Sequence, residues 1–373
     1  MLAQPYANAA VPPDRRLADA LQINLPTLHQ LHDAIANDLD PGQFGIGWWA
    51  PHPGTSRRIL ISDHLVQCVG TMSRNLIGAR LHLFELADWW EREGEFLAGA
   101  VSVGPQRGLQ VNFPPRARPL DDVLEAMAGL HLSGFFRSVI SALDCLGATV
   151  VGVLALPVGI LRSGMASALT ALNPAQARAT AGQQLQDDFR QLLEGLLAAA
   201  GPDAWFPWTG GFRNMLAHRA RRLQISQLRP SHTLYGWDGR PILRTEIVHH
   251  LAKDPALSDV EALLHRPATA LTLTEPAQVT LAGVLGSTLQ LVEGASAGLL
   301  TAWIARRQAP DVLHQPEEQW PDGPAHPPFN FDGYAPGTVP TNPGMFVTGP
   351  DTPVRFQAAA LDDAHRAQWA GFD

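Results

Sequence analysis

The chain has 373 residues, which is enough for one large domain or two to three ordinary domains with a hydrophobic core. Its formal net charge of −8 at pH 7 excludes nucleic-acid binding driven by overall charge, so any RNA or DNA contact must come from a local basic patch. The two cysteines are too few for a disulfide framework, and the first residues lack the pattern of a signal peptide. We therefore expect a soluble, cytoplasmic protein in a reducing compartment.

Residues 1–116 are expected to form a mostly helical N-terminal extension. Within it, residues 17–39 predict one or two short amphipathic helices, and residues 56–93 predict a mostly helical stretch. Residues 96–119 are punctuated by glycine and proline, a pattern that fits either short strands or loops alone. The sequence PPRARP at residues 114–119 marks the expected boundary with the next domain.

Residues 117–308 predict a bundle of helices, so the expected fold class is mainly α. Apolar side chains at three- and four-residue steps indicate a core-facing first helix; they are Leu132, Phe135, Phe136, Val139, Ile140 and Leu143. The uncharged run Cys145–Leu161 is short for a membrane span and contains Pro157. We expect this run to form a buried core helix rather than to enter a membrane.

Three further elements are predicted in the middle of the bundle. A helix capped by Asn173 should end near Gly201, with an apolar stripe of Leu185, Phe189, Leu192, Leu193, Leu196 and Leu197. A second helix is expected over about residues 212–228. Residues 231–247 then contain two β-prone runs around a Gly/Asp turn, which predict a small hairpin or an ordered loop. The adjacent His249 and His250 are expected at a helix end or in a loop.

The end of the bundle and the tail differ sharply in composition. Ser258 and Glu261 form a capping box that predicts a short helix. A long helix is expected from about Pro276 to Arg307, with Leu281, Leu285, Val292, Leu299 and Trp303 on one face. Residues 309–373 are rich in proline and glycine and predict an irregular tail with a short terminal helix.

The stretch GGFRNMLAHRARRL, which begins at Gly210, concentrates positive charge in a net-acidic protein. Five arginines and no acidic residue lie between Phe212 and His232. On a helical wheel, Phe212, Leu216, Ala220 and Leu223 form a core stripe. On the opposite side the wheel gathers Asn214, His218 and Arg221, with Arg213 on the flank.

Two interpretations of this polar face remain open. It is either an ordinary solvated helix face or an anion site. In the second case, free N–H groups of a helix starting after Gly210-Gly211 would lie beside arginines suited to phosphate. His218, which titrates near neutral pH, would then move a proton.

Arg213, Asn214 and His218 resemble the R-x(4–6)-H motif of HEPN domains, in which a polar residue, often asparagine, follows the arginine. The bare pattern is expected about three times by chance in this composition, and requiring asparagine lowers the expectation to roughly 0.1. The chain holds further bare matches, none with asparagine after the arginine: Arg57 and Arg58 with His64, Arg244 with His249 and His250, and Arg307 with His314. The resemblance covers residues 117–308, where two long helices are expected before the motif helix and another after it.

The resemblance implies a metal-independent endoribonuclease of toxin or host-defence type, with no cofactor. It implies that His218 transfers protons, Arg213 clamps the phosphate and Asn214 orients it, leaving a 2′,3′-cyclic phosphate. Because Arg213 and His218 are about 140° apart on one helix, the family's homodimer is carried over as well. Substrate-binding roles fall to Arg221 and Arg222, and Trp208 either packs in the core or stacks on a base.

The same resemblance leaves an alternative and possible regulators open. A catalytically idle module of this fold would bind nucleotide, RNA or a protein partner instead. RNA is the expected ligand of the enzyme, and an antitoxin or another regulatory protein is a possible partner. No membrane association is expected.

Other motifs receive structural interpretations. The letters G-x-S-x-G around Ser296 lie in a predicted helix without a preceding strand, so close helix packing is preferred to a nucleophile. Possible metal ligands are His29, His32 and Asp33 on one helical turn, and His82 with Glu85, but no second ligand cluster at recognisable spacing accompanies them. No metal is expected. Asp144 is an acidic candidate for the cleft of the nuclease.

Overall fold

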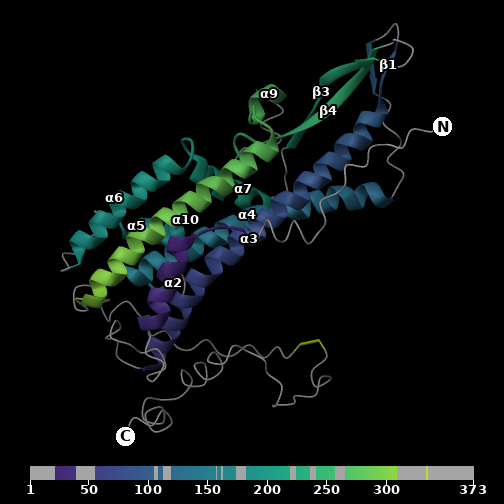
Figure 1. Cartoon of the computed structure of the whole chain (residues 1–373). Helices are drawn as coiled ribbons and strands as arrows, with labels where there is room; N and C mark the ends of the chain where they lie inside the picture. Colours follow the sequence, from purple (N-terminus) through teal and green to yellow (C-terminus); the bar gives the residue numbers. More distant parts are fainter. Residues whose placement is uncertain are drawn as a thin grey trace. The chain divides into compact units, whose positions relative to one another are not determined.

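The computed structural model describes residues 22–38, 55–104, 108–111, 119–156, 158–160, 163–173, 182–218, 224–235, 241–256, 265–308 and 333–334. Helices dominate this part of the chain, which confirms the mainly α class (Figure 1). They are α2 (Pro26–Asp38), α3 (Thr55–Ala100), α4 (Pro119–Val153), α5 (Met165–Ala171), α6 (Gln183–Ala200), α7 (Trp205–His218), α9 (Ala268–Leu271) and α10 (Ala277–Gln308).

Contacts within the chain define two compact units. Unit 1 consists of residues 1–26, 71–143 and 193–295. Unit 2 consists of residues 27–70, 144–192 and 296–373. Helices α3, α4, α6 and α10 contribute residues to both units, whereas α7 and α9 belong to unit 1 and α5 belongs to unit 2.

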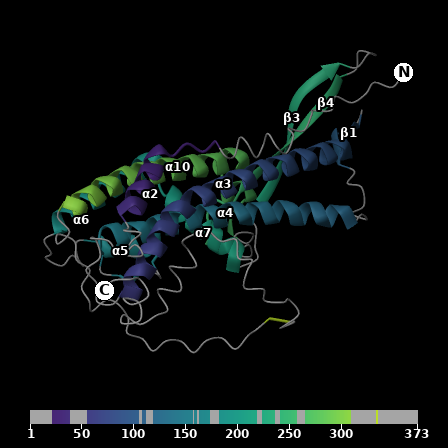
Figure 2. The ribbon, with the colours of Figure 1, turned by 60° about the horizontal axis from the view of Figure 1, so that its bottom comes forward.

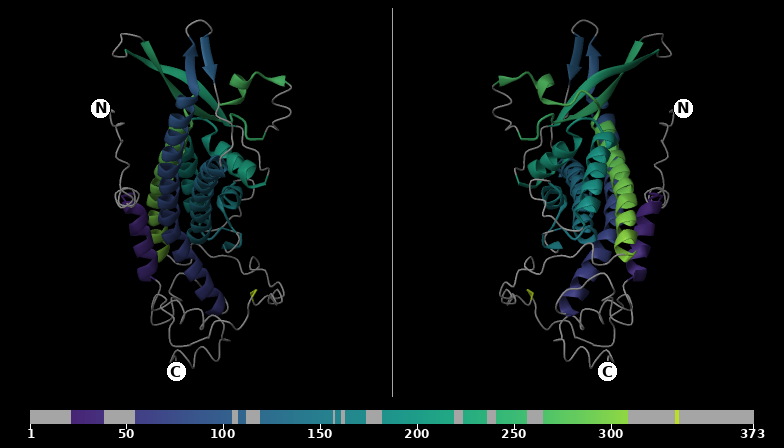
Figure 3. Two further views of the ribbon diagram at one scale, coloured as in Figure 1. Left: turned by 90° about the vertical axis from the view of Figure 1, so that its right-hand side faces the viewer. Right: turned by 90° about the vertical axis from the view of Figure 1, so that its left-hand side faces the viewer.

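Unit 1 contains two antiparallel hairpins at one end of its helices (Figure 3). The short one pairs β1 (Val101–Gly104) with β2 (Gly108–Val111), which confirms the strand interpretation of this glycine-rich stretch. The long one pairs β3 (Gln224–Tyr235) with β4 (Pro241–Leu251), with an irregular register between Pro230 and His232. The predicted second hairpin is therefore confirmed, and its strands are longer than predicted.

Helices α3 and α4 lie side by side and antiparallel (Figure 2), and they approach each other closely at glycines. In unit 1, a Cβ atom added at Gly78 would lie 3.3 Å from Ser138 Oγ, and one added at Gly134 would lie 2.4 Å from the His82 ring. A step of four residues forward along α3 is thus matched by four residues backward along α4. The glycines leave the room that the facing side chains occupy.

The predicted apolar stripes largely form the core. Leu132, Phe135, Phe136, Val139 and Leu143 of α4 are buried, as are all five residues of the predicted α10 stripe, while Ile140 is half-buried. The α6 stripe is narrower than predicted, because Phe189 and Leu193 are buried but Leu192 is 40% exposed. Periodicity therefore identified the faces of these helices correctly.

The apolar part of α4 from Ala126 to Val153 is long and apolar enough to cross a membrane by length and composition. Most of its apolar window, 67%, is buried inside the protein, as expected for a core helix. The prediction that helix continues to Leu161 is wrong, because α4 ends at Val153. Ala155 adopts a left-handed conformation with φ 49°, and Pro157 cannot continue a helix.

Helix α7 differs from the predicted helix over 212–228 at both ends. It begins at Trp205, directly after Ala204 with φ 64°, and it ends at His218. Gly210 and Gly211 are therefore internal, and a Cβ atom at Gly211 would lie 2.9 Å from Pro255. Residues 224–228 of the predicted helix belong to β3 instead, since pairing with β4 satisfies their backbone groups.

Several predicted features fall outside the described residues. These are the capping box at Ser258 and Glu261, the start of the helix after Asn173, and nearly all of the tail 309–373. The described part of that helix, α6, ends at Ala200 as predicted.

In unit 2, the last turn of α10 holds the ends of two other helices. Arg306 is 2% exposed, and its Nη1 donates to the carbonyl oxygens of Gly152 and Val153 at 2.9 and 3.1 Å. Burial lowers the pKa of this guanidinium to about 10, so it stays charged at neutral pH. Arg306 thereby satisfies carbonyl groups that the end of α4 leaves without helical partners.

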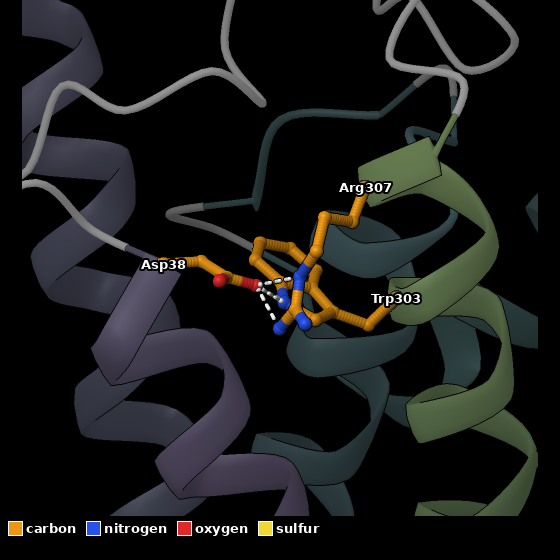
Figure 4. Close-up of polar contacts among 3 residues, drawn as sticks. All are labelled: Asp38, Trp303 and Arg307. Atoms are coloured by element: carbon orange, nitrogen blue, oxygen red, sulfur yellow. Dashed lines mark hydrogen bonds and ion pairs between the residues drawn. The ribbon is translucent and has the colours of Figure 1, made fainter.

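The neighbouring side chains anchor the end of α2 (Figure 4). Oδ2 of Asp38 accepts hydrogen bonds from Trp303 Nε1 at 2.7 Å and from Arg307 Nε at 2.8 Å. The Arg307 guanidinium also pairs with this carboxylate through Nη2. A carboxylate at the C-terminal end of a helix opposes the helix dipole, so these donors compensate an unfavourable charge.

Replacing Arg306 with Met should lower the free energy of unfolding by about 3 kcal/mol, because two buried carbonyl groups lose a charged donor. Urea denaturation of the full chain measures this change. The matched control is Arg266→Met, an exposed arginine whose replacement should change stability by less than about 0.5 kcal/mol. Equal effects of the two substitutions would contradict the role of Arg306 as a helix cap.

Candidate functional site

Helix α7 has one face fixed in the core of unit 1. Its buried residues recur every three or four positions, and they are Trp205, Thr209, Phe212 and Met215. The Phe212 ring stacks on Phe136 of α4 with centroids 4.6 Å apart, and the Trp208 ring lies 5.0 Å from Phe212. This aromatic contact fixes how α7 is rotated about its own axis.

The rotation leaves Arg213 and Asn214 on the accessible side of α7. Asn214 is exposed and Arg213 is half-buried, as the helical wheel predicts. His218 is the last residue of the helix, and its side chain lies outside the described part of the structure. Arg221 and Arg222 also lie outside it. The described residues therefore place Asn214 on the exposed face of α7 and Arg213 at the flank of that face.

The proposed use of free N–H groups after Gly210-Gly211 is wrong. These glycines lie in the second turn of α7, where backbone N–H groups are taken by the helix itself. At the true start of the helix, Trp205 N donates to Pro202 O and Trp208 N donates to Ala204 O. Any anion recognition at this site must therefore come from side chains such as Arg213.

Trp208 is built into the packing around the motif helix. Its indole N–H donates to the carbonyl oxygen of Ala252 at 3.1 Å. Its ring contacts Phe136 edge-on at 5.8 Å in addition to Phe212. The ring is half-buried, and these contacts account for its position without a bound base.

A second cluster in unit 1 surrounds His249 and His250, and the expectation that these residues lie at a helix end or in a loop is wrong. Both are buried residues of β4. The His249 ring stacks on Trp90 at 5.1 Å, and its Nε2 is 3.6 Å from Glu93 Oε2. That distance is long for a hydrogen bond, so burial dominates and, with the nearby His250, lowers the pKa of His249 to about 4.

His250 has a structural task in the same strand. Its Nδ1 lies 3.1 Å from the carbonyl oxygen of Leu273 and 3.0 Å from that of Glu275. Two acceptors at one nitrogen require that Nδ1 carries the proton. The ring therefore ties β4 to the segment that leads into α10 within unit 1.

A pair of histidines bridges α3 and α4 in unit 1. Nδ1 of His82 lies 3.1 Å from Nδ1 of His131, so one ring donates and the other accepts. Burial and the neighbouring His131 lower the pKa of His82, while Glu85 acts in the opposite direction. The sequence indicated His82 and Glu85 as half of a metal site but missed His131, because it lies on a different helix.

Within the described residues, no group of three or more His, Cys, Asp or Glu side chains could hold a metal ion. His32, from the other possible ligand set, pairs with the adjacent Asp33 through Nδ1 and Oδ1 at 3.3 Å. Asp144, an acidic candidate for the cleft, accepts a hydrogen bond from Met165 N at 3.2 Å and so holds the start of α5.

Ser296 lies within α10 and is buried, which confirms the helix-packing interpretation of its G-x-S-x-G letters. A Cβ atom at Gly294 would lie 2.5 Å from Leu196 in unit 1, and one at Gly298 would lie 2.4 Å from Leu192 in unit 2. The small residues thus let α10 approach α6 closely. A nucleophilic elbow would need a strand before the serine, and α10 provides a helix.

Comparison of the chain with protein-family models, with curated proteins and with solved structures finds no match in any of the three. Any function of the chain is therefore inferred from the motif and from the contacts described above.

Acidification should destabilise the protein through His249. Its pKa is lowered to about 4 in the folded protein. Below pH 6.5, His249 therefore binds a proton in the unfolded chain but stays neutral in the folded chain. The stabilising contribution is present above pH 6.5 and is lost as the pH falls toward 4. Lowering the pH from 7.5 to 5 should cost about 2 kcal/mol at this site.

Urea denaturation of the wild type and of His249→Phe at both pH values checks this prediction. The variant should lose less stability on acidification, because its aromatic ring keeps the contact with Trp90 without titrating. His29→Phe, at an exposed histidine, is the matched control and should keep the wild-type pH dependence. A His249→Phe variant with the full pH dependence would contradict the assignment.

Proposed function

We propose that the chain is a metal-independent endoribonuclease of the HEPN type that acts through Arg213, Asn214 and His218. The observation that supports the proposal is the position of Arg213 and Asn214 on the accessible side of α7. The opposite side of this helix is held by the stack of Phe212 on Phe136. A rigid helix with an open polar face is a suitable support for catalytic side chains.

RNA cleavage without a metal needs three things at one phosphodiester. A base must take the proton of the 2′-hydroxyl, an acid must protonate the leaving 5′-oxygen, and positive charge must stabilise the pentacoordinate phosphorane. In the proposal His218 transfers the protons, and the Arg213 guanidinium binds the phosphoryl oxygens. Asn214 orients the phosphate, and the products are a 2′,3′-cyclic phosphate and a 5′-hydroxyl.

The enzyme is proposed to act as a homodimer. Five positions along α7 separate Arg213 from His218, which corresponds to about 140° around the helix and a rise of about 7.5 Å. One copy therefore has difficulty in directing both groups at one phosphate, whereas two motif helices facing each other can pair the arginine of one with the histidine of the other. Arg221 and Arg222 follow the motif and would bind the flanking RNA backbone.

The proposed biological setting is a cytoplasmic toxin or defence effector without a cofactor. A nuclease that needs no reactant other than RNA would harm its own cell unless it were controlled. An antitoxin or another regulatory protein is the corresponding partner class.

The wild-type protein should cleave single-stranded RNA in the presence of EDTA and leave 2′,3′-cyclic phosphate ends. Arg213→Ala and His218→Ala should each lower kcat by at least about 100-fold, because charge stabilisation and proton transfer each contribute that much. Gel electrophoresis and end-group analysis measure both results. Arg74→Ala, at an exposed arginine of α3 in unit 1, is the matched control and should retain wild-type activity.

Mixing the two inactive variants tests the shared cleft directly. If each site takes its arginine from one copy and its histidine from the other, mixed dimers have one intact site. About a quarter of the wild-type activity should then return after subunit exchange, as expected for two-fold symmetry. No recovery despite subunit exchange would contradict the shared site. A wild-type protein that binds RNA or nucleotide but cleaves nothing would support the idle binding module instead.

A further inference from the structure

The two cysteines of the chain meet in unit 2 although they are far apart in sequence. Cys68 lies on α3 and is 7% exposed, while Cys145 lies on α4 and is half-buried. Both are free thiols, and the two side chains are close enough that each shifts the pKa of the other. This pairing requires explanation because the composition gave no reason to expect paired thiols.

The two cysteines lie where α3 and α4 pack against each other in unit 2. In the same unit, a Cβ atom at Gly152 of α4 would lie 3.0 Å from Leu65 Cδ1 of α3. Going from this contact to the thiol pair moves three residues forward on α3 and seven backward on α4. That is the direction required for antiparallel helices, so both cysteines lie close to this α3–α4 contact.

A histidine stands beside the pair. Nε2 of His64 lies 3.4 Å from Cys68 Sγ, one helical turn away on α3. Burial lowers the pKa of His64 below its usual value, although a hydrogen bond from its ring to the Ile160 carbonyl partly opposes this effect. The ring is therefore neutral at pH 7 and can accept a proton. The imidazole is thus a proton acceptor for the Cys68 thiol.

The contact makes the two sulfurs unequal. The interaction with Cys68 lowers the pKa of Cys145, although burial and the nearby Asp144 carboxylate act in the opposite direction. The same contact, together with burial, raises the pKa of Cys68 above the ordinary range. Cys145 is also the more accessible of the two. Because the thiolate is the reactive form, Cys145 is the side chain that meets an oxidant first.

We propose that Cys68 and Cys145 form a reversible intramolecular disulfide when a peroxide oxidises Cys145. The geometry that carries this assignment is the facing thiol pair with His64 at 3.4 Å from Cys68. It is a modification site of unit 2, and it is independent of the nuclease motif, which belongs to unit 1.

Two steps complete the reaction. The Cys145 thiolate attacks one peroxide oxygen, the O–O bond breaks, and hydroxide leaves, so that Cys145 becomes a sulfenic acid. The Cys68 thiol then gives its proton to His64 and attacks the Cys145 sulfur. The S–S bond forms, the sulfenic oxygen leaves as water, and the peroxide has been reduced by two electrons. A thiol reductant restores both cysteines by exchange.

Hydrogen peroxide added to the full-length protein in stoichiometric amounts tests the proposal. We expect free thiols to fall from two to none, the intact mass to fall by about 2 Da through loss of two hydrogens, and dithiothreitol to reverse both changes. Peptide mapping without reduction should identify a Cys68–Cys145 link. Circular dichroism before and after treatment checks that the fold persists.

Variants distinguish the roles of the three residues. In Cys68→Ser, the Cys145 sulfenic acid should persist, and dimedone should trap it. In Cys145→Ser, the remaining Cys68 should be oxidised at least 10-fold more slowly than Cys145 is in Cys68→Ser. In His64→Gln, which keeps both cysteines, the Cys145 sulfenic acid should accumulate, because the attack of Cys68 is slowed. Two persistent free thiols, disulfides only between chains, or faster oxidation of Cys68 than of Cys145 would each overturn the proposal. None of these readouts depends on RNA cleavage.

Discussion

The close antiparallel packing of α3 against α4 is the constraint from which most of the local chemistry follows. Gly134 gives the His82 ring its place in unit 1, and Gly152 gives Leu65 its place in unit 2. A side chain at either glycine would have to move the facing residue or separate the helices. Because the helices lie so close, polar side chains that face each other come into direct contact, as the His82–His131 pair shows.

The same packing positions the motif helix within unit 1. Phe136 belongs to the buried face of α4, and its ring receives Phe212 from α7. Since the aromatic stack sets the rotation of α7, it also decides that Arg213 and Asn214 lie on the accessible side. The core and the candidate site are thus two faces of one helix, and loss of the stack would disturb both.

Sequence patterns predicted what depends on local periodicity and missed what depends on distant partners. The stripes of α4 and α10 were predicted correctly because burial repeats with the helical period. The ends of α7 were predicted incorrectly. The C-terminal end was missed because β3 forms through its pairing with β4. The start was missed because glycines are tolerated inside this helix, where Pro255 packs on Gly211. The pairs His82–His131 and Cys68–Cys145 depend on the register between α3 and α4, which periodicity does not contain. Of the candidate site, the sequence predicted the open helix face but placed the helix start seven residues too late.

The structure also bears on how specific the arginine–histidine motif is. Arg307, which matches the bare pattern with His314, is engaged by the Asp38 carboxylate at the end of α2. His249 and His250, which match it with Arg244, are buried in β4 against Trp90 and backbone carbonyl groups. His64, which matches it with Arg57 and Arg58, contacts Cys68. Each of these matches contains a residue whose position is explained by packing, a helix end or a thiol. Arg213 and Asn214 differ in that they lie on the accessible side of a helix that is anchored through its opposite face. The proposed nuclease uses this pair because a guanidinium beside an amide suits a phosphate.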